Sequence, residues 1–193
     1  VVVLFNGRPL TLTWENEHAT AILDVWAPGT EAGNAIADVL FGQYNPAGKI
    51  TATFPRSVGQ IPIYYNHKNT GRPYSSGPTK FKSNYLDISN DPLYPFGYGL
   101  SYTTFTYTNL RLNNSYKINT RVKVSVDIQN TGKRDGAEVV ELYIKNLNKA
   151  IPAPLLALKG FERLSLKKGE KRTITMTIKP GDFSVINNES KAV

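Results

Sequence analysis

The stretch PLYPFGYGLSYTTF, residues 92–105, separates two parts of the chain that have different hydrophobic patterns. It combines two prolines and two glycines with several aromatic residues, and it has no charged side chain. Three interpretations are open: a phosphate-binding loop, an aromatic platform for a sugar, and a rigid joint between domains. Gly97 and Gly99 form a G-x-G pattern, but no third glycine follows at the spacing of a dinucleotide-binding loop. Phosphate binding is therefore the weakest interpretation, and buried aromatic packing in a joint is favoured over sugar stacking.

The part before this stretch has the pattern of a layered α/β domain. Residues 1–5 (VVVLF) and 21–27 (AILDVWA) are short apolar runs, typical of strands that are covered on both faces. Residues 31–42 follow a helical period, and Thr30 and Gly42 are the residues expected at the two ends of this helix. Its apolar stripe is formed by Ala32, Ile36, Val39 and Leu40. The alternation in residues 50–55 (ITATFP) predicts a third short strand.

Three strands and one helix are too few to cover both faces of a sheet. We therefore expect residues 1–60 to be the C-terminal portion of an α/β domain that is truncated at its N-terminus. Residues 61–100 are rich in Pro, Gly, Asn, Ser and Tyr and show no sustained periodicity. A stretch of this length and composition predicts an ordered connecting segment that packs on a neighbouring domain.

Residues 101–193 predict an all-β fold. In residues 121–132 (RVKVSVDIQNTG) apolar and polar side chains alternate, and the run ends in a turn. The side chains expected to face inward are Val122, Val124, Val126 and Ile128. Similar runs follow at residues 137–146, 155–170 and 171–178. This spacing is typical of a β-sandwich of about seven strands. The sequence provides five or six of them, so we expect a truncation at the C-terminus as well.

Composition excludes several classes of function. The chain has no cysteine, so disulfides and thiolate metal sites are excluded. The net charge of +8 lies in residues 101–193, where lysines alternate with β-branched residues as on a solvated sheet surface. This pattern does not favour a nucleic-acid partner. No apolar run approaches the ~20 residues that span a bilayer, and VVVLF lacks the features of a signal peptide. Any export signal is therefore expected outside this sequence.

Long motifs in both parts of the chain resemble one known family. Residues 1–10 (VVVLFNGRPL), 21–73 and 93–105 resemble the C-terminal part of glycoside hydrolase family 3 enzymes, and among these the bacterial periplasmic β-glucosidases are most similar. Residues 129–144 (QNTGKRDGAEVVELYI) and 158–170 (LKGFERLSLKKGE) resemble the fibronectin type III-like module that ends those enzymes. The resemblance covers essentially the whole chain, with its motifs in the right order.

The resemblance implies a three-domain parent with an N-terminal (β/α)₈ barrel, an α/β sandwich and a fibronectin-like domain. Residues 1–60 would be the end of a partial α/β sandwich domain, and residues 101–193 an all-β immunoglobulin- or fibronectin III-like sandwich. The parent is then expected to be a periplasmic or secreted retaining β-glucosidase. Its substrate would be a β-glucoside or oligosaccharide with a terminal non-reducing β-D-glucosyl residue. A non-catalytic carbohydrate-binding or scaffold module is the alternative.

No catalytic residue is expected in this chain. Retaining glycosidases need two carboxyl groups about 5 Å apart, one as nucleophile and one as acid/base. The resemblance places the nucleophilic aspartate in the barrel and the acid/base glutamate upstream of this sequence. The carboxylates that are present have structural interpretations. Glu15 and Glu17 flank a solvated turn, and Glu138 and Glu141 point to opposite faces of a strand. Asp24 is either a buried acid with satisfied hydrogen bonds or the residue at which its strand ends.

The loop NHKNTGRPY, residues 66–74, is the best candidate for a functional segment. Arg72, together with Tyr65 and Tyr85, would line the rim of the parent's active site and touch the leaving-group sugar. Packing against the barrel is the alternative role. His18 and His67 have no cluster of further ligands, so neither a metal nor a cofactor is expected. Truncated edges predict exposed apolar surface, and hence a homo-oligomer or a partner chain.

Overall fold

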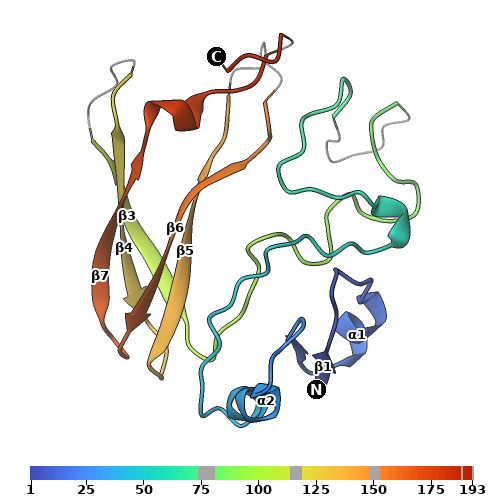
Figure 1. Cartoon of the computed structure of the whole chain (residues 1–193), viewed down its shortest axis with the longest axis vertical. Helices are drawn as coiled ribbons and strands as arrows, with labels where there is room; N and C mark the ends of the chain where they lie inside the picture. Colours follow the sequence, from blue (N-terminus) through green and yellow to red (C-terminus); the bar gives the residue numbers. More distant parts are fainter. Residues whose placement is uncertain (74–80, 114–118, 148–152, 188, 193) are drawn as a thin grey trace. The chain divides into compact units, whose positions relative to one another are not determined.

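The computed structural model describes residues 1–73, 81–113, 119–147, 153–187 and 189–192. The chain forms two compact units (Figure 1). The first unit comprises Val1–Tyr44 and Lys49–Tyr98, and the second comprises Asn45–Gly48 and Gly99–Val193. Within the described ranges, no helix is long and apolar enough to span a bilayer. The chain is mostly β with few helices, which is consistent with an α/β part followed by a β-sandwich.

The first unit is built on two short parallel strands, β1 (Val2–Leu4) and β2 (Ile22–Asp24). The crossover between them contains α1 (Thr13–His18), and α2 (Ala32–Leu40) follows β2. A 3-10 turn, η1 (Val58–Gln60), is the last regular element of this unit. The strand–crossover–strand–helix order is the one that the sequence predicts, and the two strands form a parallel pair.

The details of the helices differ from the prediction. α2 begins after Glu31 rather than Thr30, and no side chain caps its first turn. Gly42 has a φ of 76°, so it ends the helix in the left-handed conformation, as expected. Leu40 is 38% exposed and lies outside the apolar stripe. Glu15 and Glu17 lie in α1, so the expected solvated turn is a short helix.

The third strand predicted for residues 50–55 is not formed. Phe54 makes only an isolated antiparallel bridge to Tyr94, in which its N–H donates to the Tyr94 oxygen at 2.9 Å. The next N–H that could extend the bridge into a ladder is that of Arg56, and it donates to the Gln60 side chain instead. Thr53, Phe54 and Pro55 are all buried, with Thr53 8% and Phe54 2% exposed, so burial in this stretch does not alternate as it would along a strand.

The second unit consists of two antiparallel sheets. One sheet has the order β3-β4-β7, with β3 (Phe105–Leu112), β4 (Val122–Asn130) and β7 (Lys171–Ile178). The other pairs β5 (Gly136–Ile144) with β6 (Ala157–Leu166). A 3-10 turn, η2 (Pro180–Phe183), follows β7. Five strands are thus formed in the described residues of this unit, and β4 to β7 lie in the segments that the sequence predicts.

A hydrophobic core joins the two sheets face to face. Its buried members come from four strands: Ile128 of β4, Val140 of β5, Leu164 and Leu166 of β6, and Ile174 of β7. The inward alternation predicted for β4 is confirmed, since Val124 and Ile128 are 7% and 0% exposed. The outer face of the same strand is not simply solvated, because Asp127 is only 5% exposed.

Residues 45–48 belong to the second unit through one side chain. The Asn45 Oδ1 atom accepts hydrogen bonds from the Ser101 hydroxyl at 2.9 Å and from the Tyr102 N–H at 2.8 Å. Its Nδ2 atom donates to the backbone oxygen of Asp135 at 3.0 Å. This amide therefore ties the start of the β-sandwich to the turn before β5.

Candidate functional site

The connecting segment forms a long loop whose two ends are held together by one buried side chain. Gln60 is 2% exposed. Its Oε1 atom accepts the N–H of Arg56 at 2.6 Å, and its Nε2 atom donates to the backbone oxygen of Ser89 at 2.9 Å. The Arg56 Nε atom donates to the backbone oxygen of Asp91 at 3.0 Å. These bonds close the loop of residues 61–88 at its base, where the two chain segments that lead into and out of the loop run side by side (Figure 1).

A second set of hydrogen bonds crosses the loop between the predicted site residues. The Ser83 N–H donates to the backbone oxygen of Arg72 at 2.9 Å, and the hydroxyls of Thr70 and Ser83 lie 2.8 Å apart. The Tyr85 N–H donates to the Asn90 side chain at 3.0 Å. Arg72 and Tyr85 are therefore held on neighbouring segments, and both side chains are exposed.

Tyr65 occupies a different environment from the other two candidates. Its ring stacks on Phe96 with centroids 4.3 Å apart and an interplanar angle of 22°. Phe96 belongs to the joint-like stretch of residues 92–105, and there Tyr94 and Tyr98 stack in the same way at 5.1 Å. Tyr65 is half-buried, so its ring packs against the joint, whereas Arg72 and Tyr85 present their side chains to solvent.

Sequence reasoning missed the residues that hold this loop in place. Gln60 and Arg56 are single polar residues without a motif, and their pairing with Ser89 and Asp91 joins positions about thirty residues apart. The only local signal is the Ser57 cap of η1, whose Oγ accepts the N–H of Gly59 at 3.2 Å. Tyr74, the last residue of the predicted functional loop, lies outside the described residues.

The two histidines of the first unit make local contacts. His18 stacks on Trp14 at 4.6 Å, and the His67 ring hydrogen-bonds with the backbone oxygen of Lys68 at 3.1 Å. Among the described residues, no group of three or more His, Asp or Glu side chains could hold a metal. Burial raises the pKa of Asp24. The Asp24 Oδ1 atom accepts the Trp26 N–H at 3.1 Å, but Oδ2 is buried without a partner. Of the two alternatives for Asp24, the fully satisfied acid is therefore wrong, and the end of the strand is confirmed, because β2 ends at this residue.

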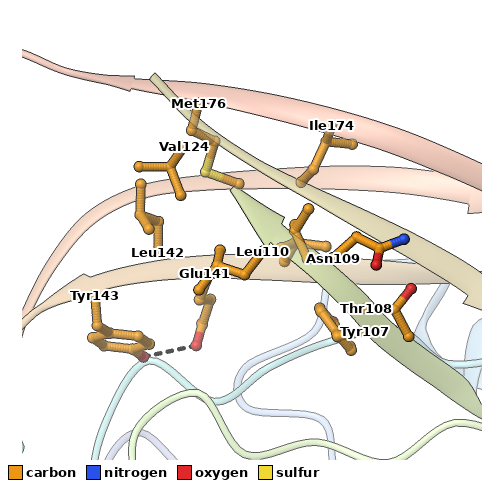
Figure 2. A pocket seen from close by; sticks show the side chains of 12 residues that line it. Tyr107, Thr108, Asn109, Leu110, Val124, Glu141, Leu142, Tyr143, Ile174 and Met176 are labelled. Carbon is orange, nitrogen blue, oxygen red and sulfur yellow. Dashed lines mark hydrogen bonds between the residues drawn. The ribbon is translucent and has the colours of Figure 1, made fainter. Parts of the chain in front are cut away.

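An apolar cleft of about 510 Å³ lies in the second unit (Figure 2). Its lining includes Tyr107 of β3 and Tyr143 of β5, and the Tyr143 hydroxyl donates to Glu141 at 2.7 Å. Burial raises the pKa of Tyr107 well above its ordinary value, and its hydrogen bond with Glu138 and the charge of Glu141 add to this. Glu138 and Glu141 thus both raise the pKa of Tyr107, although the alternation of side chains along the strand predicts that the two glutamates lie on opposite faces of the sheet.

Comparison with known proteins identifies the family. A model of the glycosyl hydrolase family 3 C-terminal domain matches residues 1–102, and one of the fibronectin type III-like domain matches residues 138–193. Since the first match covers more than half of the sequence, the chain belongs to glycosyl hydrolase family 3. The resemblance seen in the sequence is confirmed.

Individual relatives agree with this assignment. A periplasmic beta-glucosidase of Salmonella typhimurium is 54% identical over 92% of this chain and 24% of its own length. A beta-xylosidase of Formosa agariphila is 42% identical over 100% of this chain and 26% of its own length. The crystal structure of a beta-glucosidase from Listeria innocua in complex with glucose matches with a TM-score of 0.94 and 41% identity, covering 99% of this chain and 27% of that chain. The chain thus spans about a quarter of the curated relatives it matches.

Proposed function

We propose that the chain is the C-terminal part of a retaining β-glucosidase that releases terminal non-reducing β-D-glucosyl residues. The observation that carries the proposal is the 54% identity with the periplasmic beta-glucosidase of Salmonella typhimurium. The likeness to the glucose complex of the Listeria innocua beta-glucosidase supports it. Because beta-xylosidases are also among the relatives, the choice of glucose over xylose is the finer part of the proposal.

In this proposal the chain contributes scaffold and rim rather than the catalytic carboxylates. Residues 1–60 are the end of an α/β sandwich domain, residues 61–100 a connecting segment, and residues 101–193 a fibronectin III-like sandwich. The nucleophile and the acid/base belong to parts of the longer protein outside this sequence, including an N-terminal barrel. The longer protein acts in the periplasm or outside the cell, as the name of the Salmonella relative suggests.

The loop of residues 61–88 is the part of this chain that we assign to substrate binding. Arg72 and Tyr85 support this role, because both are exposed on segments that backbone and side-chain hydrogen bonds hold rigidly together. An arginine donates hydrogen bonds to sugar hydroxyls, and a tyrosine ring stacks on a pyranose face. Tyr65 acts indirectly, since its stacking on Phe96 orients the start of the loop.

The test is turnover of an aryl β-glucoside by the isolated chain and by the longer enzyme. The isolated chain is expected to show no turnover. In the longer enzyme, Arg72→Ala and Tyr85→Ala are expected to lower kcat/KM about tenfold or more, through the loss of contacts with the leaving-group sugar. Arg121→Ala and Tyr44→Ala remove exposed side chains elsewhere and serve as matched controls. Turnover by the isolated chain that one local carboxylate substitution abolishes would contradict the proposal.

A further inference from the structure

Two short segments carry the residues that we assign to substrate binding. These rim segments are residues 70–72, which end at Arg72, and residues 83–85, which end at Tyr85. The Ser83 N–H donates to the backbone oxygen of Arg72 at 2.9 Å, and a contact of 2.8 Å between two hydroxyls adds a second link. Every residue of both segments is exposed, so apolar burial contributes little to their arrangement. Hydrogen bonds therefore decide how the two rim segments lie.

The side chain of Asn90 holds the second rim segment at both of its ends. Its Oδ1 atom accepts the Tyr85 N–H at 3.0 Å, and its Nδ2 atom donates to the backbone oxygen of Ser83 at 2.8 Å. One side-chain amide can make both bonds, because it carries an acceptor oxygen and donor N–H groups on the same carbon. An alanine at this position would make neither bond, and an aspartate would keep only the acceptor. The amide of Asn90 is thus matched to the backbone of this segment.

The backbone of Asn90 is itself anchored on both sides. The preceding residue, Ser89, accepts the Gln60 Nε2 atom on its backbone oxygen at 2.9 Å. The following residue, Asp91, accepts the Arg56 Nε atom on its backbone oxygen at 3.0 Å. The Ser89 Oγ atom also accepts the Asp91 N–H at 3.1 Å, so the three residues form a tight turn. The base of the loop therefore fixes Asn90, and the Asn90 side chain passes this position on to the second rim segment.

A continuous path of hydrogen bonds runs from the base of the loop to both proposed binding residues. The path divides at Asn90. One branch is the direct bond from the Tyr85 N–H, and the other branch continues through Ser83 to the backbone oxygen of Arg72. Two exposed residues thus take their positions from a buried one, Gln60, through the side chain of Asn90.

We propose that Asn90 is a positioning residue for substrate binding, whose side-chain amide sets where Tyr85 and Arg72 meet the leaving-group sugar. The inference rests on the proposed function of these two residues. Asn90 acts through them and not on the sugar itself, since its Oδ1 and Nδ2 atoms are both engaged with backbone groups. Its effect on turnover must therefore disappear once the residues that it positions have been removed.

Amide hydrogen exchange of this chain, measured by NMR, tests the positioning without any need for activity. In Asn90→Ala the Ser83 N–H is expected to exchange about fivefold faster, although its own bond goes to Arg72, because the segment is no longer held in place. The matched control is Asn113→Ala in the second unit, which removes an Oδ1 atom that accepts the Lys123 N–H at 2.7 Å. The control should leave exchange at Ser83 unchanged. Unchanged exchange at Ser83 in Asn90→Ala would overturn the proposal.

Turnover of cellobiose by the longer enzyme separates a positioning role from a purely structural one. Asn90→Ala is expected to lower kcat/KM about tenfold in the otherwise unsubstituted enzyme, but less than about twofold when Arg72→Ala and Tyr85→Ala are already present. An equal loss in both backgrounds, or no loss in either, would overturn this inference alone. If Arg72→Ala and Tyr85→Ala themselves leave kcat/KM unchanged, the proposed function is wrong, and the role of Asn90 in substrate binding falls with it.

Asn90→Asp tests the two branches separately. The aspartate keeps the acceptor for the Tyr85 N–H and loses the donor to the Ser83 oxygen, so it should release only the branch that leads to Arg72. Its loss of kcat/KM, expected to be about threefold, should vanish in an Arg72→Ala background and persist in a Tyr85→Ala background. The reverse dependence would contradict the proposed path.

Discussion

Gln60 donates a hydrogen bond from Nε2 to the backbone oxygen of Ser89 at 2.9 Å and thereby closes the longest loop of the first unit at its base. The same side chain accepts the Arg56 N–H at 2.6 Å and is 2% exposed. A side-chain amide with both ends satisfied in a buried position specifies one arrangement of the two chain segments, because any other arrangement leaves a buried polar atom without a partner. The position of Arg72 and Tyr85 depends on this closure.

Gln60→Ala is expected to destabilise the first unit by about 1–3 kcal/mol, because it leaves the Arg56 N–H and the Ser89 oxygen without partners. Urea unfolding followed by tryptophan fluorescence measures this, since both tryptophans of the chain lie in the first unit. Gln43→Ala is the control, because Gln43 is exposed and its loss should change stability by less than about 0.5 kcal/mol. Equal effects of the two substitutions would show that Gln60 does not hold the loop.

The environment of Asp127 predicts that the stability of the second unit depends on pH. It accepts hydrogen bonds from Asn109 at 2.9 Å and Thr173 at 2.7 Å, and it forms ion pairs with Arg111 at 2.8 Å and Lys171 at 3.1 Å. The hydrogen bonds from Asn109, Thr173 and Lys171 and the charge of Arg111 hold the pKa of this carboxyl far below its ordinary value. The folded state therefore binds the proton less readily than the unfolded chain does.

The stabilisation from Asp127 is consequently present above the unfolded pKa of about 3.9 and is lost as the pH falls below it. The midpoint of thermal unfolding, followed by circular dichroism between pH 2 and pH 7, should fall more steeply towards low pH for the unsubstituted chain than for Asp127→Asn. Asp87→Asn, at an exposed position, is the control and should keep the steep decline. If the unfolding midpoints of the unsubstituted chain and of Asp127→Asn fall equally steeply with decreasing pH, the prediction is wrong.

The alternation of apolar and polar side chains along the β-strands could be predicted from the sequence, because one face of each sheet packs on the same buried core. β4 to β7 of the second unit lie in segments predicted to be extended, and Ile128 faces inward as expected. The network around Asp127 could not be predicted, since it depends on the register of three strands and on Asn109. Asn109 has a φ of 54° where β3 changes register against β4. Such irregular positions leave no periodic signal in a sequence.

Contacts that only the tertiary fold creates could not be predicted at the candidate site either. The composition of residues 61–100 predicts an ordered connecting segment, and hydrogen bonds join several of its described residues. Which residues order the segment could not be predicted, because Gln60 and Ser89 are paired only by the tertiary fold. The prediction of a strand at residues 50–55 failed for a related reason: the tertiary fold buries the consecutive residues Thr53, Phe54 and Pro55, and the sequence pattern does not show this.

Asn130 is expected to be among the most sensitive positions of the second unit. It is completely buried, it accepts the Thr103 hydroxyl at 2.7 Å, and it donates to the backbone oxygens of Arg134 at 2.8 Å and Leu166 at 3.1 Å. Asn130→Ala should lower the free energy of unfolding of the second unit by more than about 2 kcal/mol. Asn130→Asp keeps the shape but removes both donors, so it should also be strongly destabilising. Gln129→Ala, on the neighbouring half-buried residue, should change stability far less, and urea unfolding followed by circular dichroism measures all three.

Gly132 is predicted to tolerate no side chain, for a reason that differs from backbone strain. A Cβ atom at this position would overlap the Thr103 hydroxyl and would lie 2.6 Å from the backbone nitrogen of Thr104. Because a backbone atom cannot rotate away, Gly132→Ala should displace the start of β3 and cost about 1–3 kcal/mol. Gly181→Ala is the matched control, since a Cβ atom there has no neighbour within 4 Å. Faster hydrogen exchange at Thr104 in Gly132→Ala alone would locate the damage at this contact, whereas equal stability of the two variants would show that the turn can move aside.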